Sequence, residues 1–162
     1  MDSRGTLREV VFVCSGNTCR SPMAEGFARY FLKLHGIDDR WKTSSLGVTA
    51  FEGLPASELA VTVMLEYGID ISKHRSRRAE SWNPPEGSLA LGMTWEHVDR
   101  MKRLHPDEGT TILLLGEVSL PFCQDGTLEV PDPFGSDLPR YREVAAIIRK
   151  MTLGLVNGLG AF

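Results

Sequence analysis

Residues 13–22 read VCSGNTCRSP, and this stretch decides how the rest of the chain can be organised. It follows an apolar run at residues 10–13, which is typical of a central parallel strand covered on both faces. A helix is predicted to begin near Pro22 and to continue to about Leu34. A strand, a polar loop with glycine and a helix N-terminus together form an anion site. The loop amides converge on one point, and the helix adds about half a positive charge there.

A thiol at the start of the loop and an arginine at its end distinguish it from an ordinary nucleotide-binding loop. Five residues separate Cys14 from Arg20, so both side chains can face one bound oxyanion once the loop curls. A thiolate in this position can attack phosphorus while the guanidinium holds two oxygens in a bidentate contact. The stretch therefore predicts a cysteine-dependent phosphatase.

The composition is that of one ordinary globular domain. The chain has 162 residues, of which 42% are hydrophobic and 24% charged, so we expect a single domain over residues 1–162. A net charge of −3 does not favour binding to nucleic acid. The longest apolar runs are only as long as a strand, too short to span a membrane. We therefore expect neither nucleic acid nor a membrane as a partner.

The cysteines indicate the compartment. There are three, and this odd number argues against a disulfide framework and for a reducing environment. No charged and apolar leader precedes the first strand, so we expect a cytoplasmic protein. Cys123 has no partner by spacing and is expected to be incidental.

Strands and helices are predicted to alternate along the chain. This pattern favours an α/β fold, a single doubly wound domain with a mostly parallel four-stranded sheet and helices on both faces. Ligands bind outside the carboxyl ends of such strands, which is where Cys14 falls. The predicted strands are residues 10–13, 41–44, 88–93 and 111–115, and the predicted helices are residues 22–34, 56–67, 95–104 and 138–155.

The loop from Cys14 to Pro22 resembles the phosphate-binding loop of low-molecular-weight protein tyrosine phosphatases. That family also carries an Asp-Pro pair far downstream, and Asp132 and Pro133 stand there, followed by Phe134. Chain length, loop position and the pair all agree, so the resemblance spans nearly the whole chain. It implies hydrolysis of phosphotyrosine on a protein or peptide through a phosphocysteine intermediate. Separately, we expect a monomer. Neither a metal nor another cofactor is implied, because the loop supplies the charge that a cation otherwise would.

The resemblance also implies a role for each matching residue. Cys14 would be the nucleophile, and Arg20 would bind the phosphoryl oxygens and stabilise their arrangement in the transition state. Asp132 would protonate the leaving group and then activate water. Phe134 would form one wall of the cleft. The remaining residues of the phosphate loop are Ser15, Gly16, Asn17, Thr18, Cys19 and Ser21.

Several residues would support the loop rather than react. Ser21 would hydrogen-bond the thiolate, or cap the helix, or do both. Asn17 is expected in a left-handed conformation, with Ser45 and His74 as its supports. Without the loop, His74 would be read as a surface histidine in a basic segment. Cys19 would form a reversible disulfide with the nucleophile under peroxide, or would simply be a small core residue.

The substrate class stays open between two alternatives. A variant of the family removes phosphate from phosphoarginine and resembles this chain at Thr18, where typical tyrosine phosphatases carry a bulkier aliphatic residue. The hydroxyl of Thr18 could orient the attacking water, and Phe134 fits both classes. Phosphotyrosine is favoured, because Thr18 is a single residue.

Two further functions are weaker alternatives. Thioredoxin-coupled arsenate reductases share the loop but need two more cysteines after the third strand, and residues 72–110 contain none. A catalytically idle phosphate-binding module would not need Cys14, Arg20 and Asp132 together.

Overall fold

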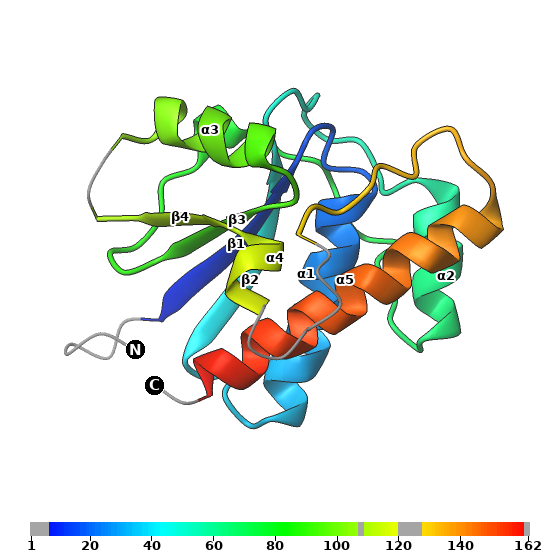
Figure 1. Cartoon of the computed structure of the whole chain (residues 1–162), viewed down its shortest axis with the longest axis horizontal. Helices are drawn as coiled ribbons and strands as arrows, with labels where there is room; N and C mark the ends of the chain where they lie inside the picture. The colour runs from blue at the N-terminus through cyan, green and yellow to red at the C-terminus, as the bar shows by residue number, and fades with distance from the viewer. Residues whose placement is uncertain (1–6, 107–108, 120–127, 161–162) are drawn as a thin grey trace.

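A four-stranded parallel sheet forms the centre of the molecule (Figure 1). The computed structural model describes residues 7–106, 109–119 and 128–160. The strands lie in the order β2-β1-β3-β4, and every neighbouring pair is parallel, which confirms the predicted fold class. Their bounds are β1 Arg8–Cys14, β2 Trp41–Gly47, β3 Leu89–Gly92 and β4 Thr111–Leu114.

The helices follow the strands in alternation. The sequence predicted α3 with its observed bounds, whereas α1 begins two residues earlier than expected and α5 ends later. The short helix α4 and the 3₁₀ turn η1 were not predicted. The bounds are α1 Arg20–Leu34, α2 Glu58–Glu66, η1 Ala79–Ser81, α3 Trp95–Leu104, α4 Leu115–Ser119 and α5 Leu138–Leu159.

Both faces of the sheet are covered, because successive residues of β1 point to opposite sides. Val10 and Phe12 belong to the core cluster that includes α1 and α5, whereas Val11 and Val13 belong to the cluster that includes α3. Figure 1 shows α3 on one side of the strands and α1 and α5 on the other. Each such side chain contributes about 1.5–3 kcal/mol by leaving water, so the central strand is firmly held.

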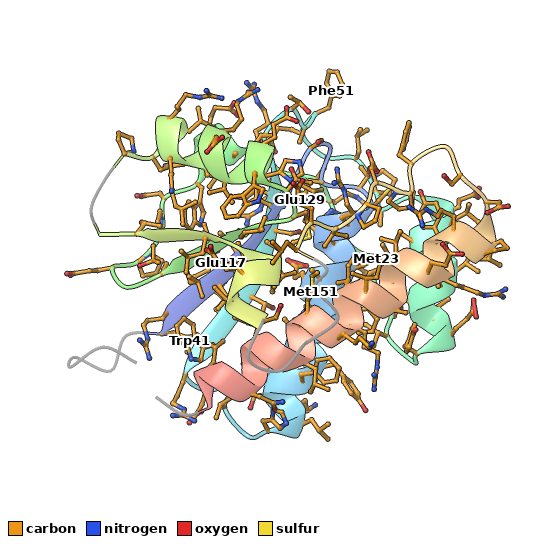
Figure 2. All side chains as sticks on the ribbon, viewed as in Figure 1. Met23, Trp41, Phe51, Glu117, Glu129 and Met151 are labelled. Atoms are coloured by element: carbon orange, nitrogen blue, oxygen red, sulfur yellow. The ribbon has the colours of Figure 1, made fainter. Side chains whose placement is uncertain are left out.

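Helices α1 and α5 pack through apolar side chains. Met23 of α1 and Met151 of α5, both labelled in Figure 2, are fully buried members of the same core cluster. None of the helices in the described part of the chain is long and apolar enough to cross a membrane.

The carboxyl ends of the strands carry the connections that matter for function. The carbonyl of Cys14 accepts from the Val48 amide at 3.0 Å, which joins the end of β1 to the segment after β2. The carbonyl of Met93, just after β3, accepts from the Val130 amide at 2.9 Å. This second bond brings the segment that carries Asp132 to the edge of the sheet where β1 ends.

Candidate active site

The loop after β1 ends at a helix N-terminus that is open to a ligand. Cys19 is the residue that caps α1, and its side chain makes no capping hydrogen bond. The first turn of α1 contains no acidic residue. The first amides of a helix have no partner within it, so this end favours an anion. Arg20, the first residue of α1, is only 5% exposed.

Asn17 has a left-handed backbone with φ of 57°, which confirms the predicted conformation. Its side-chain amide donates to the hydroxyls of Ser21 at 2.8 Å and Ser45 at 2.9 Å. Its side-chain carbonyl accepts from the Arg77 amide at 2.9 Å. His74 Nε2 donates to the backbone carbonyl of Asn17 at 2.7 Å. The two predicted supports therefore both contact Asn17, and Arg77 is a third that the sequence did not indicate.

The close packing of Gly47 and the hydrogen bond from His74 also hold the loop in place. Gly47 ends β2 against the loop, and a Cβ there would lie 2.5 Å from the carbonyl oxygen of Ser15, so no larger residue fits. Burial lowers the pKa of His74, although its hydrogen bond to Asn17 acts in the opposite direction. A neutral His74 still has one N–H to donate, so the bond to the loop persists at neutral pH.

The thiol of Cys14 lies at the base of the loop and is 3% exposed. Its sulfur is 2.9 Å from the hydroxyl oxygen of Ser21. Because Asn17 already donates to that oxygen, the proton of Ser21 can point to sulfur. A thiolate has no proton to donate, so Ser21 must be the donor to it. The hydroxyl of Ser21 is therefore placed to donate to the sulfur of Cys14.

The guanidinium of Arg20 is held from two sides. Its Nη1 donates to the carbonyl of Val130 at 3.1 Å, and its Nη2 lies 3.5 Å from the hydroxyl of Ser15. The same Nη2 is 3.6 Å from a carboxylate oxygen of Asp132, which makes a loose ion pair. Arg20 thus joins the loop to the segment with the carboxylate.

Asp132 lines the same cavity as the loop. Its other carboxylate oxygen accepts from the Phe134 amide at 3.1 Å, and the Asp132 side chain is 53% exposed. Phe134 is 73% exposed and forms a projecting wall. A cavity of about 200 Å³ lies between these groups and is lined by Cys14, Ser15, Gly16, Thr18, Cys19, Arg20, Asp132 and Phe134.

The other predicted residues lie behind the cavity. Asn17 and Ser21 are fully buried beneath the loop, and Ser45 and His74 contact Asn17 from the far side. The structure therefore brings all twelve predicted residues into one cluster, eight on the cavity and four behind it. Cys123 falls outside the described residues.

Cys19 contacts a tyrosine that the sequence did not single out. The Cys19 sulfur is 3.2 Å from the Tyr141 hydroxyl and 3.4 Å from that of Ser57. The two hydroxyls are 3.2 Å apart. Burial, followed by the hydrogen bond to Cys19, raises the pKa of Tyr141 to about 12, so this tyrosine stays neutral. The thiol of Cys19 is thus held by two neutral hydroxyls.

His97 of α3 is a further residue that sequence reasoning missed. It is 2% exposed, and its Nε2 is 3.0 Å from the hydroxyl of Ser15 in the loop. Burial lowers the pKa of His97 to about 4; the charge of Arg20 adds to this shift and that of Asp132 opposes it. The available signal was its place three residues after Thr94, where a capping side chain commonly stands.

Metal ligation finds no support among the described residues. They contain no group of three or more histidine, cysteine, aspartate or glutamate side chains that could hold an ion.

Sequence comparison assigns the chain to a group of phosphatases. The sequence model of the family "Low molecular weight phosphotyrosine protein phosphatase" matches residues 9–161. A probable low molecular weight protein-tyrosine-phosphatase, EpsP of Ralstonia nicotianae, is 30% identical over 144 residues, 89% of this chain and 90% of its own length. A protein-arginine-phosphatase of Geobacillus stearothermophilus is 33% identical over 133 residues, 82% of this chain and 83% of its own.

Solved structures give the same result. The low molecular weight protein tyrosine phosphatase from T. tengcongensis superposes with a TM-score of 0.77 at 33% identity, over 93% of this chain and 99% of that one. The YwlE arginine phosphatase from Geobacillus stearothermophilus superposes with a TM-score of 0.75 at 30% identity, over 95% and 94%.

Proposed function

Because the chain belongs to the low molecular weight phosphotyrosine protein phosphatase family, we propose that it removes phosphate from phosphotyrosine on proteins through a phosphocysteine intermediate. Family membership makes it a hydrolase of phosphomonoesters. The observation that carries the proposal is one cavity lined by Cys14, Arg20 and Asp132 at the open end of α1.

In the first step the phosphate group sits in the loop and the sulfur of Cys14 attacks phosphorus. A sulfur–phosphorus bond forms as the bond from phosphorus to the tyrosine oxygen breaks. Asp132, half exposed at the cavity mouth, gives its proton to that oxygen, and neutral tyrosine leaves. Arg20 and the amides of the loop stabilise the charge on the three remaining phosphoryl oxygens.

In the second step water replaces the sulfur. Asp132 is now a carboxylate and takes a proton from the water as its oxygen bonds to phosphorus. The sulfur–phosphorus bond breaks, and Cys14 leaves as a thiolate. The hydroxyl of Ser21, 2.9 Å from the sulfur, supports this departure. Inorganic phosphate is the product. The proton that Asp132 takes from the water restores its acid form, so the enzyme is back in its starting state.

Phosphoarginine is a second candidate substrate, and Thr18 is the residue that favours it. Thr18 lines the cavity, and its hydroxyl is 3.8 Å from the Cys19 sulfur, too long for a strong hydrogen bond. This hydroxyl is therefore available to a bound group or a water molecule. The similarity to the protein-arginine-phosphatase supports the same candidate.

Further properties belong to the same proposal. We propose that residues 1–162 form a single phosphatase domain, which acts as a cytoplasmic monomer without a metal or another cofactor.

The deciding experiment compares turnover of a phosphotyrosine peptide and a phosphoarginine peptide of the same sequence. We expect kcat/KM to be higher for the phosphotyrosine peptide, and we expect Cys14→Ser to abolish both activities. A clear preference for the phosphoarginine peptide would replace the leading candidate with the second. Trapping of a phosphorylated Cys14 during turnover would support the intermediate, and its absence under rapid quenching would count against it.

A further inference from the structure

His97 holds its ring in one protonation state and one orientation. Its Nδ1 lies 3.1 Å from the backbone nitrogen of Thr94, which can only donate. Nδ1 must therefore be the acceptor, and in a neutral ring the proton is then on Nε2. The capping contact of α3 thus determines which nitrogen of His97 can donate.

The proton on Nε2 points to the hydroxyl of Ser15, 3.0 Å away. Arg20 Nη2 is the second donor near that oxygen, at 3.5 Å. A hydroxyl accepts two hydrogen bonds and donates one. Because both neighbours are donors, the proton of Ser15 is left for a third partner. Ser15 lines the cavity, so a ligand bound in the loop can be that partner.

The backbone of Ser15 is fixed independently of His97. The carbonyl of Ser15 accepts from the Thr49 amide at 3.0 Å, and Gly47 packs closely against the same oxygen. A change at position 97 therefore alters the direction of the hydroxyl proton rather than the course of the loop. The charged groups that face His97 are Arg20, from α1, and Asp132, from the segment before α5.

We propose that His97 orients the hydroxyl of Ser15 as a hydrogen-bond donor to the phosphoryl group, which makes His97 a positioning residue of the phosphate site. This inference rests on the proposed function of the same cavity. A phosphoryl group at neutral pH carries only acceptor oxygens toward the loop. A hydrogen bond from a neutral hydroxyl to such a charged oxygen is stronger than one between neutral groups.

The test uses two substitutions of His97 whose side chains differ in length, so that only the longer one can reach the hydroxyl of Ser15. In His97→Gln, the amide oxygen and nitrogen are spaced like the two ring nitrogens, so Gln can accept from Thr94 and donate to Ser15. In His97→Asn, the oxygen can still accept from Thr94, but the side chain is too short to reach Ser15. The pair keeps the cap of α3 and changes only the contact with the loop. Thermal melting of both variants checks that α3 remains folded.

The measurements are calorimetric affinity for inorganic phosphate and kcat/KM for para-nitrophenyl phosphate. We expect His97→Asn and Ser15→Ala each to weaken phosphate binding roughly tenfold, the size of one hydrogen bond to an anion. We expect His97→Gln to stay within about threefold of the original protein. The double variant His97→Asn with Ser15→Ala should be no worse than Ser15→Ala alone, because His97 acts only through that hydroxyl.

The results separate this inference from the proposed function. If the losses of phosphate affinity in the two single variants add in the double variant, His97 does not act through Ser15. The same conclusion follows if His97→Gln loses as much phosphate affinity as His97→Asn. The phosphatase proposal would survive that result. If the original protein neither binds phosphate nor turns over the ester, both proposals fall together.

Discussion

The phosphate loop and the segment at residues 130–134 line the same cavity, but they are held in different ways. In the loop, Asn17 is fully buried and each of its side-chain polar atoms and its carbonyl has a partner. In the other segment, Asp132 is 53% exposed, with one backbone hydrogen bond and one loose ion pair.

This contrast fits the two tasks. The phosphoryl group is the same in every substrate, so a rigid set of donors can be aimed at it before it arrives. The leaving group varies, and in the proposed mechanism Asp132 must reach leaving groups of different shapes at the mouth of the cavity. Phe134, which lines the cavity on the same side as Asp132, is also exposed, at 73%.

Replacing Cys14, the proposed nucleophile, should have the largest effect. Cys14→Ser should lower turnover by at least about 10⁴-fold, because the hydroxyl does not ionise near neutral pH. Phosphate binding should remain measurable by calorimetry, since the loop amides and Arg20 are unchanged. Turnover near that of the original protein would show that Cys14 is not the nucleophile.

Removing the acid should have the next largest effect, and the effect should depend on the substrate. Asp132→Ala should lower kcat roughly 10²–10⁴-fold for a phosphotyrosine peptide, whose leaving group needs a proton. The loss should be much smaller for para-nitrophenyl phosphate, whose leaving group is stable as an anion. Equal losses on both substrates would mean that Asp132 holds the segment in place and does not transfer protons.

A larger residue at position 47, behind the phosphate loop, should lower activity although it changes no reacting group. In Gly47→Ala the new Cβ would lie 2.5 Å from the Ser15 carbonyl, so the loop must shift. A shift of this kind should lower kcat/KM by about 10²-fold and stability by about 1–3 kcal/mol. Gly160→Ala is the matched control, because its Cβ would meet nothing closer than 3.6 Å. Wild-type kinetics in Gly47→Ala would show that the loop is not rigid.

The rigid region was also the more predictable one. Glycine, asparagine, cysteine and arginine at fixed spacing between a strand and a helix leave few possible loop geometries. The left-handed Asn17 and its contacts with Ser45 and His74 were predicted from the family resemblance. The main strands and helices were predictable for a similar reason, since apolar periodicity records which face is buried.

The missed residues come from other parts of the chain. Tyr141 on α5 and His97 on α3 reach the loop only because the fold packs those helices beside it. The sequence around a single tyrosine or histidine in an amphipathic helix does not indicate that its side chain contacts a distant loop. The helix α4 was missed because its five residues continue directly from the apolar strand β4. Its first residue, Leu115, was therefore predicted as the end of that strand, and the other four were assigned to no element.

Oxidation tests how firmly the thiol of Cys19 is held within the loop. Mild peroxide should inactivate the enzyme and dithiothreitol should restore it, with peptide mapping showing a Cys14–Cys19 disulfide. The Cys19 thiol must first leave the hydroxyls of Tyr141 and Ser57. Tyr141→Phe should therefore speed disulfide formation by a few-fold. Equal recovery in Cys19→Ala would exclude Cys19 as the residue that protects the nucleophile.

The smallest expected effect on turnover concerns Thr18, a loop residue that lines the cavity. Phosphoarginine has a labile phosphorus–nitrogen bond and a planar, charged leaving group, whereas phosphotyrosine has a stronger phosphorus–oxygen bond and a flat ring that needs space. The threonine hydroxyl can donate or accept a hydrogen bond in the cavity, and isoleucine at the same position can only fill space. Thr18→Ile should therefore lower kcat/KM for a phosphoarginine peptide more than for a phosphotyrosine peptide.

We expect the ratio of the two kcat/KM values to change by about tenfold, or ~1.4 kcal/mol, which one hydrogen bond can supply. Thr18→Ser is the matched control, because it keeps the hydroxyl and removes only a methyl group. If the hydroxyl selects the substrate, serine should retain the original ratio and isoleucine should not. A ratio within about twofold for isoleucine would remove the main support for phosphoarginine. Selection would then have to come from the exposed wall at Phe134, on the adaptable side of the cavity.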